Sequence, residues 1–173
     1  GINAKVIYPL IKKLSKLSPN AIIIMITNPL DAMAYLALKA SKFSSKKIIG
    51  LSGILDSSRF SSFVAKELKI SIKEIESITV GSHGEEMVPL PRFSTVNGIP
   101  ISNLLSNGKI KKIEEHTKKA GEEIVRLLGA NASISTGAAA VKMVESILHD
   151  EKEVLPCSTY LNGEYGIKDL YVG

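Results

Sequence analysis

The feature that most limits the fold of this chain is the continuous apolar run at residues 21–26, which is followed by Asn28 and Pro29. A short run rich in β-branched residues and bounded by an Asn-Pro pair is typical of a strand buried on both faces. Strands of that kind belong to parallel sheets covered by helices. The run therefore predicts an α/β fold with a parallel sheet.

Apolar periodicity predicts the remaining elements. Helices are predicted over residues 2–17, 30–40, 54–68, 110–128 and 138–148, and strands over 21–26, 47–51, 75–80, 92–96, 99–101, 154–160 and 170–172. The Asn97-Gly98 pair predicts a two-residue hairpin turn. Because parallel-type strands come first and antiparallel ones later, we expect a domain boundary near Gly50–Gly53, with domains at residues 1–50 and 51–173.

Three side chains form the most informative polar set. Asp56 and Arg59 lie three residues apart in a predicted helix, so they share a face, and His83 follows a predicted strand between Gly81 and Gly84. A guanidinium can hold a carboxylate through two hydrogen bonds, and a carboxylate can orient an imidazole that exchanges a proton with a hydroxyl. This set of groups suits the oxidation of a 2-hydroxy acid.

Plainer interpretations stay open for each residue. Asp56 and Arg59 can form an ordinary surface ion pair, and His83 can lie in a plain loop. Asn28 leaves the carboxyl end of a predicted parallel strand, where ligands of open α/β sheets bind, but it also suits a turn before Pro29.

Four segments, in this order and at these intervals, resemble the lactate/malate dehydrogenase family, and more narrowly its lactate-dehydrogenase-like malate dehydrogenases. They are Thr27–Asp31, Gly53–Phe60, Gly81–Gly84 and Met87–Leu90. The resemblance implies the end of a parallel Rossmann-type sheet, with the remnant of the NAD-binding domain at 1–50. It also implies a catalytic domain at 51–173 with antiparallel strands and long helices, incomplete at its C-terminus.

The resemblance also implies roles for the polar side chains. His83 matches the family's proton acceptor, Asp56 the carboxylate that orients it, and Arg59 the residue that binds the substrate carboxylate. Asn28 matches a residue that contacts both substrate and nicotinamide. The implied reaction is hydride transfer between NAD and a 2-hydroxy dicarboxylic acid, malate to oxaloacetate, a step of the tricarboxylic acid cycle.

For the cofactor, the resemblance implies that Ile26 and Thr27 supply backbone beside NAD, together with Asn28. Asn3 matches a cofactor-contacting asparagine at the start of a helix. No metal is implied. The partners implied are a small 2-hydroxy or 2-keto acid and further copies of the chain, as a dimer or tetramer.

Two alternatives remain. Lactate dehydrogenase is one, because the family's substrate-discriminating loop is absent from this sequence and some lactate dehydrogenases also carry a Met-Val-Pro-Leu segment like Met87–Leu90. A non-catalytic remnant or interaction module is the other, because the family's G-x-G-x-x-G turn is absent. The sequence also departs from the family at Glu85, where aspartate is usual, and at 131–139, where Ser133, Ser135 and Thr136 predict a small, polar pocket wall. A flexible linker at 129–137 is the plainer interpretation.

Composition argues against several other classes. The net charge is +5 and the pI about 9.2, but the lysines are dispersed and only 5% of residues are aromatic, which does not favour nucleic-acid binding. His116 and His149 are predicted surface residues without metal-ligand partners. A lone Cys157 suits a reducing compartment, and no apolar run or leader-like segment predicts a membrane span, so we expect a cytoplasmic protein.

Overall fold

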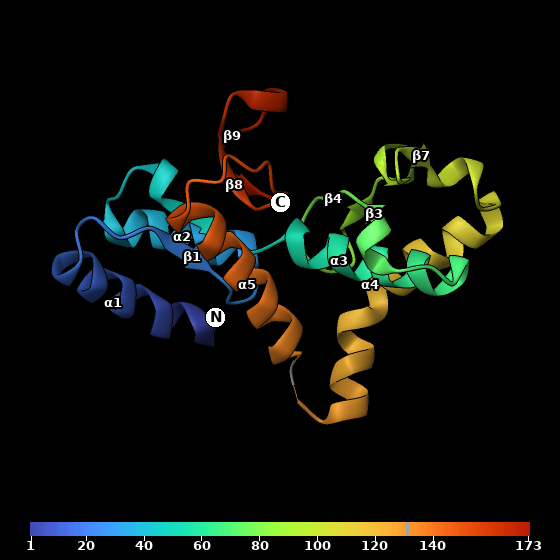
Figure 1. The fold of residues 1–173 in the computed structure, drawn as a ribbon. Coiled ribbons are helices and arrows are strands. Elements are labelled where there is room, and N and C mark those ends of the chain that lie inside the picture. The colour runs from blue at the N-terminus through green and yellow to red at the C-terminus, as the bar shows by residue number, and fades with distance from the viewer. Residues whose placement is uncertain (131) are drawn as a thin grey trace. The chain divides into compact units, whose positions relative to one another are not determined.

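The computed structural model describes residues 1–130 and 132–173, which form two compact units (Figure 1). Unit 1 comprises Gly1–Ser52 and Cys157–Gly173, and unit 2 comprises Gly53–Pro156. Both combine helices with small sheets, so the predicted α/β class is confirmed. No helix within the described residues has the length and apolar character needed to cross a bilayer.

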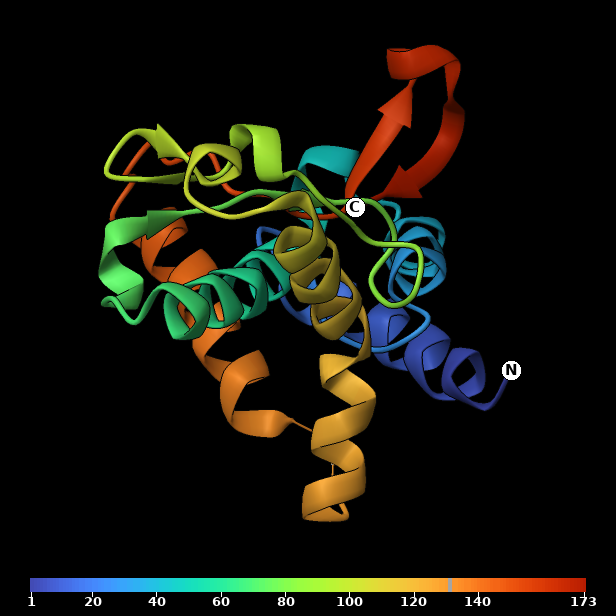
Figure 2. The same cartoon turned by 90° about the vertical axis from the view of Figure 1, so that its right-hand side faces the viewer.

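Unit 1 contains a parallel strand pair with helices packed against it. Its elements are α1 (Ile2–Leu17), β1 (Ile23–Met25), α2 (Leu30–Ser41), η1 (Ser45–Lys47), β2 (Ile48–Gly50), β8 (Thr159–Asn162), η5 (Glu164–Gly166) and β9 (Lys168–Val172). Ile23 pairs with Ile48 and Met25 with Gly50 in parallel register, as the apolar run predicted. Strands β8 and β9 form an antiparallel ribbon, drawn as two red arrows in Figure 2.

The core of unit 1 gathers side chains from both of its chain segments. Its buried residues are Ile11, Met25, Leu30, Met33, Ala34, Ala37, Ala40, Ile48 and Tyr171. Tyr171, only 1% exposed, donates a hydrogen bond to the Ile48 carbonyl oxygen at 3.2 Å, and Ser158 forms an antiparallel bridge with Gly50. These contacts place Cys157–Gly173 with the N-terminal segment, which differs from the expected division at residue 51.

Unit 2 carries the long helices and the short antiparallel strands. Its elements are α3 (Gly53–Leu68), η2 (Ile72–Glu74), β3 (Ile75–Glu76), β4 (Thr79–Val80), β5 (Val88–Pro89), η3 (Pro91–Phe93), β6 (Thr95–Val96), β7 (Ile99–Pro100), η4 (Ile101–Asn103), α4 (Asn107–Leu128) and α5 (Ser133–Leu148). Helices α3 and α4 pack around a core of Phe60, Val64, Ala65, Ile75, Ile101, Leu105, Ile110 and Ile113. The predicted hairpin across Asn97-Gly98 is confirmed as the antiparallel pair β6–β7.

Some predicted boundaries were wrong. The strand predicted at 75–80 is two strands, because β3 pairs with β6 whereas β4 pairs with β5. The strand predicted at 154–160 begins only at Thr159, where β9 supplies a partner. Helix α5 begins at Ser133, so most of the segment interpreted as a pocket wall or a linker is helical; its first residue, Asn131, lies outside the described residues.

Candidate active site

The start of α3 lies unusually close to strand β4. A Cβ atom added to Gly53 would collide with the Thr79 carbonyl oxygen and lie 2.8 Å from Cβ of Pro156. Only glycine allows this approach without a backbone shift. The approach sets the first turn of α3, which carries Asp56, beside β4 and the loop that follows it.

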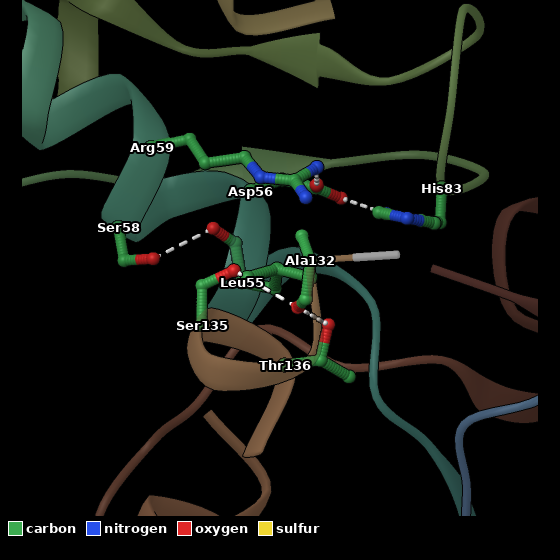
Figure 3. Close-up of polar contacts among 8 residues, drawn as sticks. All are labelled: Leu55, Asp56, Ser58, Arg59, His83, Ala132, Ser135 and Thr136. Atoms are coloured by element: carbon green, nitrogen blue, oxygen red, sulfur yellow. Dashed lines mark hydrogen bonds and ion pairs between the residues drawn. The ribbon is translucent and has the colours of Figure 1, made fainter. Parts of the chain in front are cut away.

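Asp56 lies between an imidazole and a guanidinium. Its Oδ2 is 2.9 Å from Nδ1 of His83 and its Oδ1 is 3.6 Å from Nη1 of Arg59 (Figure 3). The Asp56 side chain is 1% exposed, that of Arg59 11% and that of His83 19%. Because a carboxyl group is costly to bury without donors or opposite charge nearby, Arg59 and His83 are the partners that allow Asp56 to be buried. The three predicted side chains are thus brought together.

The loop that carries His83 joins the antiparallel strands β4 and β5. Gly81 adopts a φ of 86°, and a Cβ there would lie 2.9 Å from the Glu86 carbonyl oxygen, so this turn needs glycine. With Nδ1 of His83 directed at Asp56, the carboxylate favours the tautomer protonated on Nδ1. Nε2 is then the ring atom available to take a proton from a bound hydroxyl.

Arg59 is held in a mostly buried position. Burial lowers the pKa of its guanidinium, while the negative charge of Asp56 acts in the opposite direction. An arginine remains charged under such conditions, because its pKa starts far above neutrality. Its Nε, like Oδ1 of Asp56, is buried without a hydrogen-bond partner within the described part of the chain. The guanidinium therefore has hydrogen-bonding capacity that the described residues leave unused.

Sequence reasoning missed Gly121, a glycine within α4 that lies beside the guanidinium of Arg59. A Cβ at this position would lie 3.5 Å from Nη1 and 3.7 Å from Nη2 of Arg59. A glycine in a helix interior costs about 1 kcal/mol relative to alanine. A glycine kept in a helix interior despite this cost indicates a packing role. Its contact with Arg59 shows which side chain it packs against.

The hydroxyl groups expected to line a pocket are engaged in α5 itself. Ser135 Oγ and Thr136 Oγ1 both donate to the Ala132 carbonyl oxygen, at 3.3 and 2.8 Å (Figure 3). Ser133 is exposed. Two of these three hydroxyl groups are therefore engaged within the first turn of the helix.

The candidate cofactor residues belong to unit 1. Ile26, Thr27 and Asn28 directly follow β1, and Ile26 remains 45% exposed although it is apolar. Asn3 Nδ2 donates to the Asn28 carbonyl oxygen at 2.7 Å, so these two predicted residues lie together. An accessible segment at the carboxyl end of a parallel strand fits a nicotinamide cofactor.

Within residues 1–130 and 132–173, no group of three or more His, Cys, Asp or Glu side chains could hold a metal ion. His116 is exposed on α4, 5.4 Å from the Phe63 ring, and His149 caps the C-terminus of α5. Cys157 is a free thiol whose pKa is raised by burial.

Comparisons with known proteins agree with the geometry. Residues 1–50 match the model described as lactate/malate dehydrogenase, NAD binding domain, and residues 54–173 match the lactate/malate dehydrogenase, alpha/beta C-terminal domain. NAD, the cofactor expected from the sequence, is thus the one named for the first of these domains.

The similar relatives are malate and lactate dehydrogenases. Malate dehydrogenase of Roseiflexus sp. (strain RS-1) is 48% identical over 173 residues, which is 99% of this chain and 56% of the relative. The structure of malate dehydrogenase from Salinibacter ruber has a TM-score of 0.96 at 44% identity and covers 99% of this chain and 56% of that one. Lactate dehydrogenase from Eimeria maxima, solved with NADH and oxamate, has a TM-score of 0.94 at 40% identity and covers 99% and 54%.

The chain therefore spans about half the length of the curated relatives it matches. Over that span, two family models in consecutive order account for nearly every residue. The resemblance to lactate/malate dehydrogenases that the four motifs indicated is confirmed over 99% of the chain. This chain belongs to the lactate/malate dehydrogenase family.

Proposed function

We propose that this chain is the catalytic part of an NAD-dependent malate dehydrogenase that interconverts malate and oxaloacetate. The observation that carries the proposal is the buried Asp56 carboxylate, 2.9 Å from His83 and 3.6 Å from Arg59. An imidazole with a fixed tautomer beside a guanidinium supplies both a proton acceptor and a carboxylate clamp.

Each residue has a distinct part in the proposed reaction. Arg59 binds the substrate carboxylate and so orients the carbon that bears the hydroxyl group. His83 takes the hydroxyl proton at Nε2, and Asp56 stabilises the resulting imidazolium. In the reverse direction His83 returns the proton to the ketone oxygen. Because that step needs protonated His83, ketoacid reduction is expected to weaken as the pH rises.

The cofactor would be held by residues 26–28 and by Asn3. NAD, when bound, supplies the acceptor for the hydride that leaves the substrate carbon. Asn28 follows the parallel strand β1, and its carbonyl oxygen is already engaged by Asn3, so its side-chain amide is the part proposed to contact substrate and nicotinamide. If NADH no longer stabilises the Asn28→Ala protein, that result would support the assignment.

The test of the clamp is a pair of arginine variants in the full-length protein. Arg59→Lys keeps the charge but loses the planar fork, so the KM for oxaloacetate should rise at least tenfold. Arg92→Lys is the matched control, because Arg92 is exposed and lies over the Phe93 ring, 4.5 Å from its centroid. Equal effects of the two changes would contradict the clamp.

Lactate dehydrogenase is the second candidate. Lactate dehydrogenases from Eimeria maxima and Cryptosporidium parvum match 99% of this chain with TM-scores of 0.94, nearly as high as the malate enzymes. Comparing kcat/KM for oxaloacetate and pyruvate distinguishes the two activities. A preference for pyruvate would replace the malate assignment.

A non-catalytic role is separated from both enzymes by cofactor binding. Titration of the protein with NADH should show saturable, stoichiometric binding if the dehydrogenase proposal holds, and none if the chain is a remnant or interaction module. The proposal includes a role in the tricarboxylic acid cycle, a homo-oligomeric state and a cytoplasmic location. The single free thiol, Cys157, is compatible with that location.

A further inference from the structure

Three serines join helix α3 to the segment that contains β3 and β4. Ser57 Oγ accepts a hydrogen bond from the Thr79 backbone N–H at 2.9 Å, and Ser77 Oγ donates to the Ser57 carbonyl oxygen at 2.8 Å. Ser61 Oγ lies 2.8 Å from Ser77 Oγ. We call Ser57, Ser61 and Ser77 the serine seam.

The hydroxyl protons of the seam run in one direction. Ser77 has a single hydroxyl proton, which it donates to Ser57, so Ser61 must be the donor in its contact with Ser77. Ser57 is 8% exposed, Ser61 6% and Thr79 0%. Because buried donors and acceptors are costly to leave unpaired, the seam fixes a single register between the helix and the strands.

The seam lies next to both halves of the catalytic pair. Ser57 directly follows Asp56 on α3, and Thr79 begins β4, which leads into the loop carrying His83. Apolar packing also holds α3 in place, but such contacts are not directional and tolerate sliding. Hydrogen bonds from a serine side chain to the backbone of α3 or β4 are directional and do not tolerate sliding. The seam is therefore a directional link between the two elements that carry Asp56 and lead to His83.

We propose that the serine seam is a positioning device that sets the Asp56–His83 hydrogen bond by fixing α3 against β4. The proposal rests on the proposed dehydrogenase function, in which that hydrogen bond orients the proton acceptor. Arg59 is on α3 with Asp56 and moves with it, so loss of the seam displaces His83 relative to both. The expected effect falls on kcat, while KM for the substrate changes little.

The experiment compares serine variants of the full-length protein. Ser57→Ala and Ser77→Ala each remove one link, and Ser77→Thr restores the hydroxyl group of the second. Ser62→Ala is the control, because Ser62 is exposed and its Oγ donates to the Ser58 carbonyl oxygen within the same helix, at 2.8 Å. Steady-state kinetics with oxaloacetate and NADH give kcat and KM separately.

The second readout does not depend on catalysis. Nuclear magnetic resonance of 15N-labelled histidine reports the tautomer of His83 and the hydrogen-bonded proton on its Nδ1, with the signal assigned by its disappearance in His83→Gln. In the parent and in Ser62→Ala, this proton should be shifted downfield by its bond to Asp56. In Ser57→Ala and Ser77→Ala the signal should move upfield or be lost to exchange with solvent.

The proposal predicts a fall in kcat of about 10- to 100-fold in Ser57→Ala and Ser77→Ala, a KM within about twofold of the parent, and recovery in Ser77→Thr. Unchanged kcat and an unchanged His83 signal in folded variants would overturn it. If Ser57→Ala does not fold, Ser77→Ala decides by the same readouts. If the parent lacks dehydrogenase activity, the function fails, and the His83 signal alone still decides the seam.

Discussion

Replacing Asp56 with asparagine tests the electrostatic core of the site. The variant keeps the size of the side chain and an oxygen that can accept the Nδ1–H of His83, but it removes the negative charge. At an effective dielectric constant of about 20, two unit charges separated by the 2.9 Å between Asp56 Oδ2 and His83 Nδ1 attract each other by roughly 6 kcal/mol. This is the upper limit of what the charge contributes to the imidazolium.

The net loss is smaller than this limit. The carboxylate is desolvated in the folded protein, and the asparagine retains one hydrogen bond, so we expect about 2–4 kcal/mol of transition-state stabilisation to be lost. At 1.36 kcal/mol for each factor of ten, kcat/KM for oxaloacetate reduction should fall roughly 30- to 1000-fold at neutral pH. Arg59 also loses its ion-pair partner, 3.6 Å away.

The assay is NADH oxidation followed at saturating cofactor, with thermal unfolding measured on the same samples. Asp150→Asn is the control, because the Asp150 side chain is 77% exposed and its ion-pair partner, Lys152, lies two residues along the chain. A folded Asp56→Asn protein whose kcat/KM stays within threefold of the parent would refute the reasoning, since the carboxylate would then contribute almost nothing to proton transfer.

Three further predictions concern glycines and a buried tyrosine. Gly121→Val should raise the KM for oxaloacetate about tenfold by crowding the guanidinium of Arg59, whereas Gly108→Val in the same helix, where an added Cβ meets nothing within 4 Å, should leave KM unchanged. Gly53→Ala should lower the free energy of unfolding by about 3 kcal/mol, measured by urea denaturation, because its Cβ collides with the β4 backbone. Burial raises the pKa of Tyr171 to about 12. The neutral phenol therefore contributes its full stabilisation of the fold below about pH 10, and this contribution is lost as the pH rises toward 12. A phenolate absorbance change of this residue near pH 10 in the folded protein would contradict the prediction.

The helices were predictable because their apolar faces are long. The range predicted for α1, residues 2–17, agrees with the structure, and α3 begins one residue earlier than predicted. Helix α4 begins at Asn107, before its first buried apolar residue, so periodicity could not locate its first turn. The short strands were harder, because pairing partners distant in sequence decide where each one starts and ends.

The residue types of the site could be predicted from the sequence, but the contacts that hold them in place could not. The spacing of Asp56 and Arg59 indicated a shared helix face, the turn between Gly81 and Gly84 singled out His83, and the resemblance assigned the roles of all three. Which strand would bring His83 to Asp56 depends on the β4–β5 pairing and on the close approach at Gly53. Neither the serine seam nor Gly121 stands out in a single sequence, because serines and glycines have many other uses.

The return of the chain to unit 1 has a consequence for synthesis on the ribosome. Tyr171 fills the core of unit 1, but all of Gly53–Pro156 must be translated before Tyr171 emerges. At about 5–20 residues per second, the nascent N-terminal segment waits roughly 5–20 s with that core unfilled. The intervening unit can fold during that interval, and a chaperone that shields β1 and β2 would act in this window.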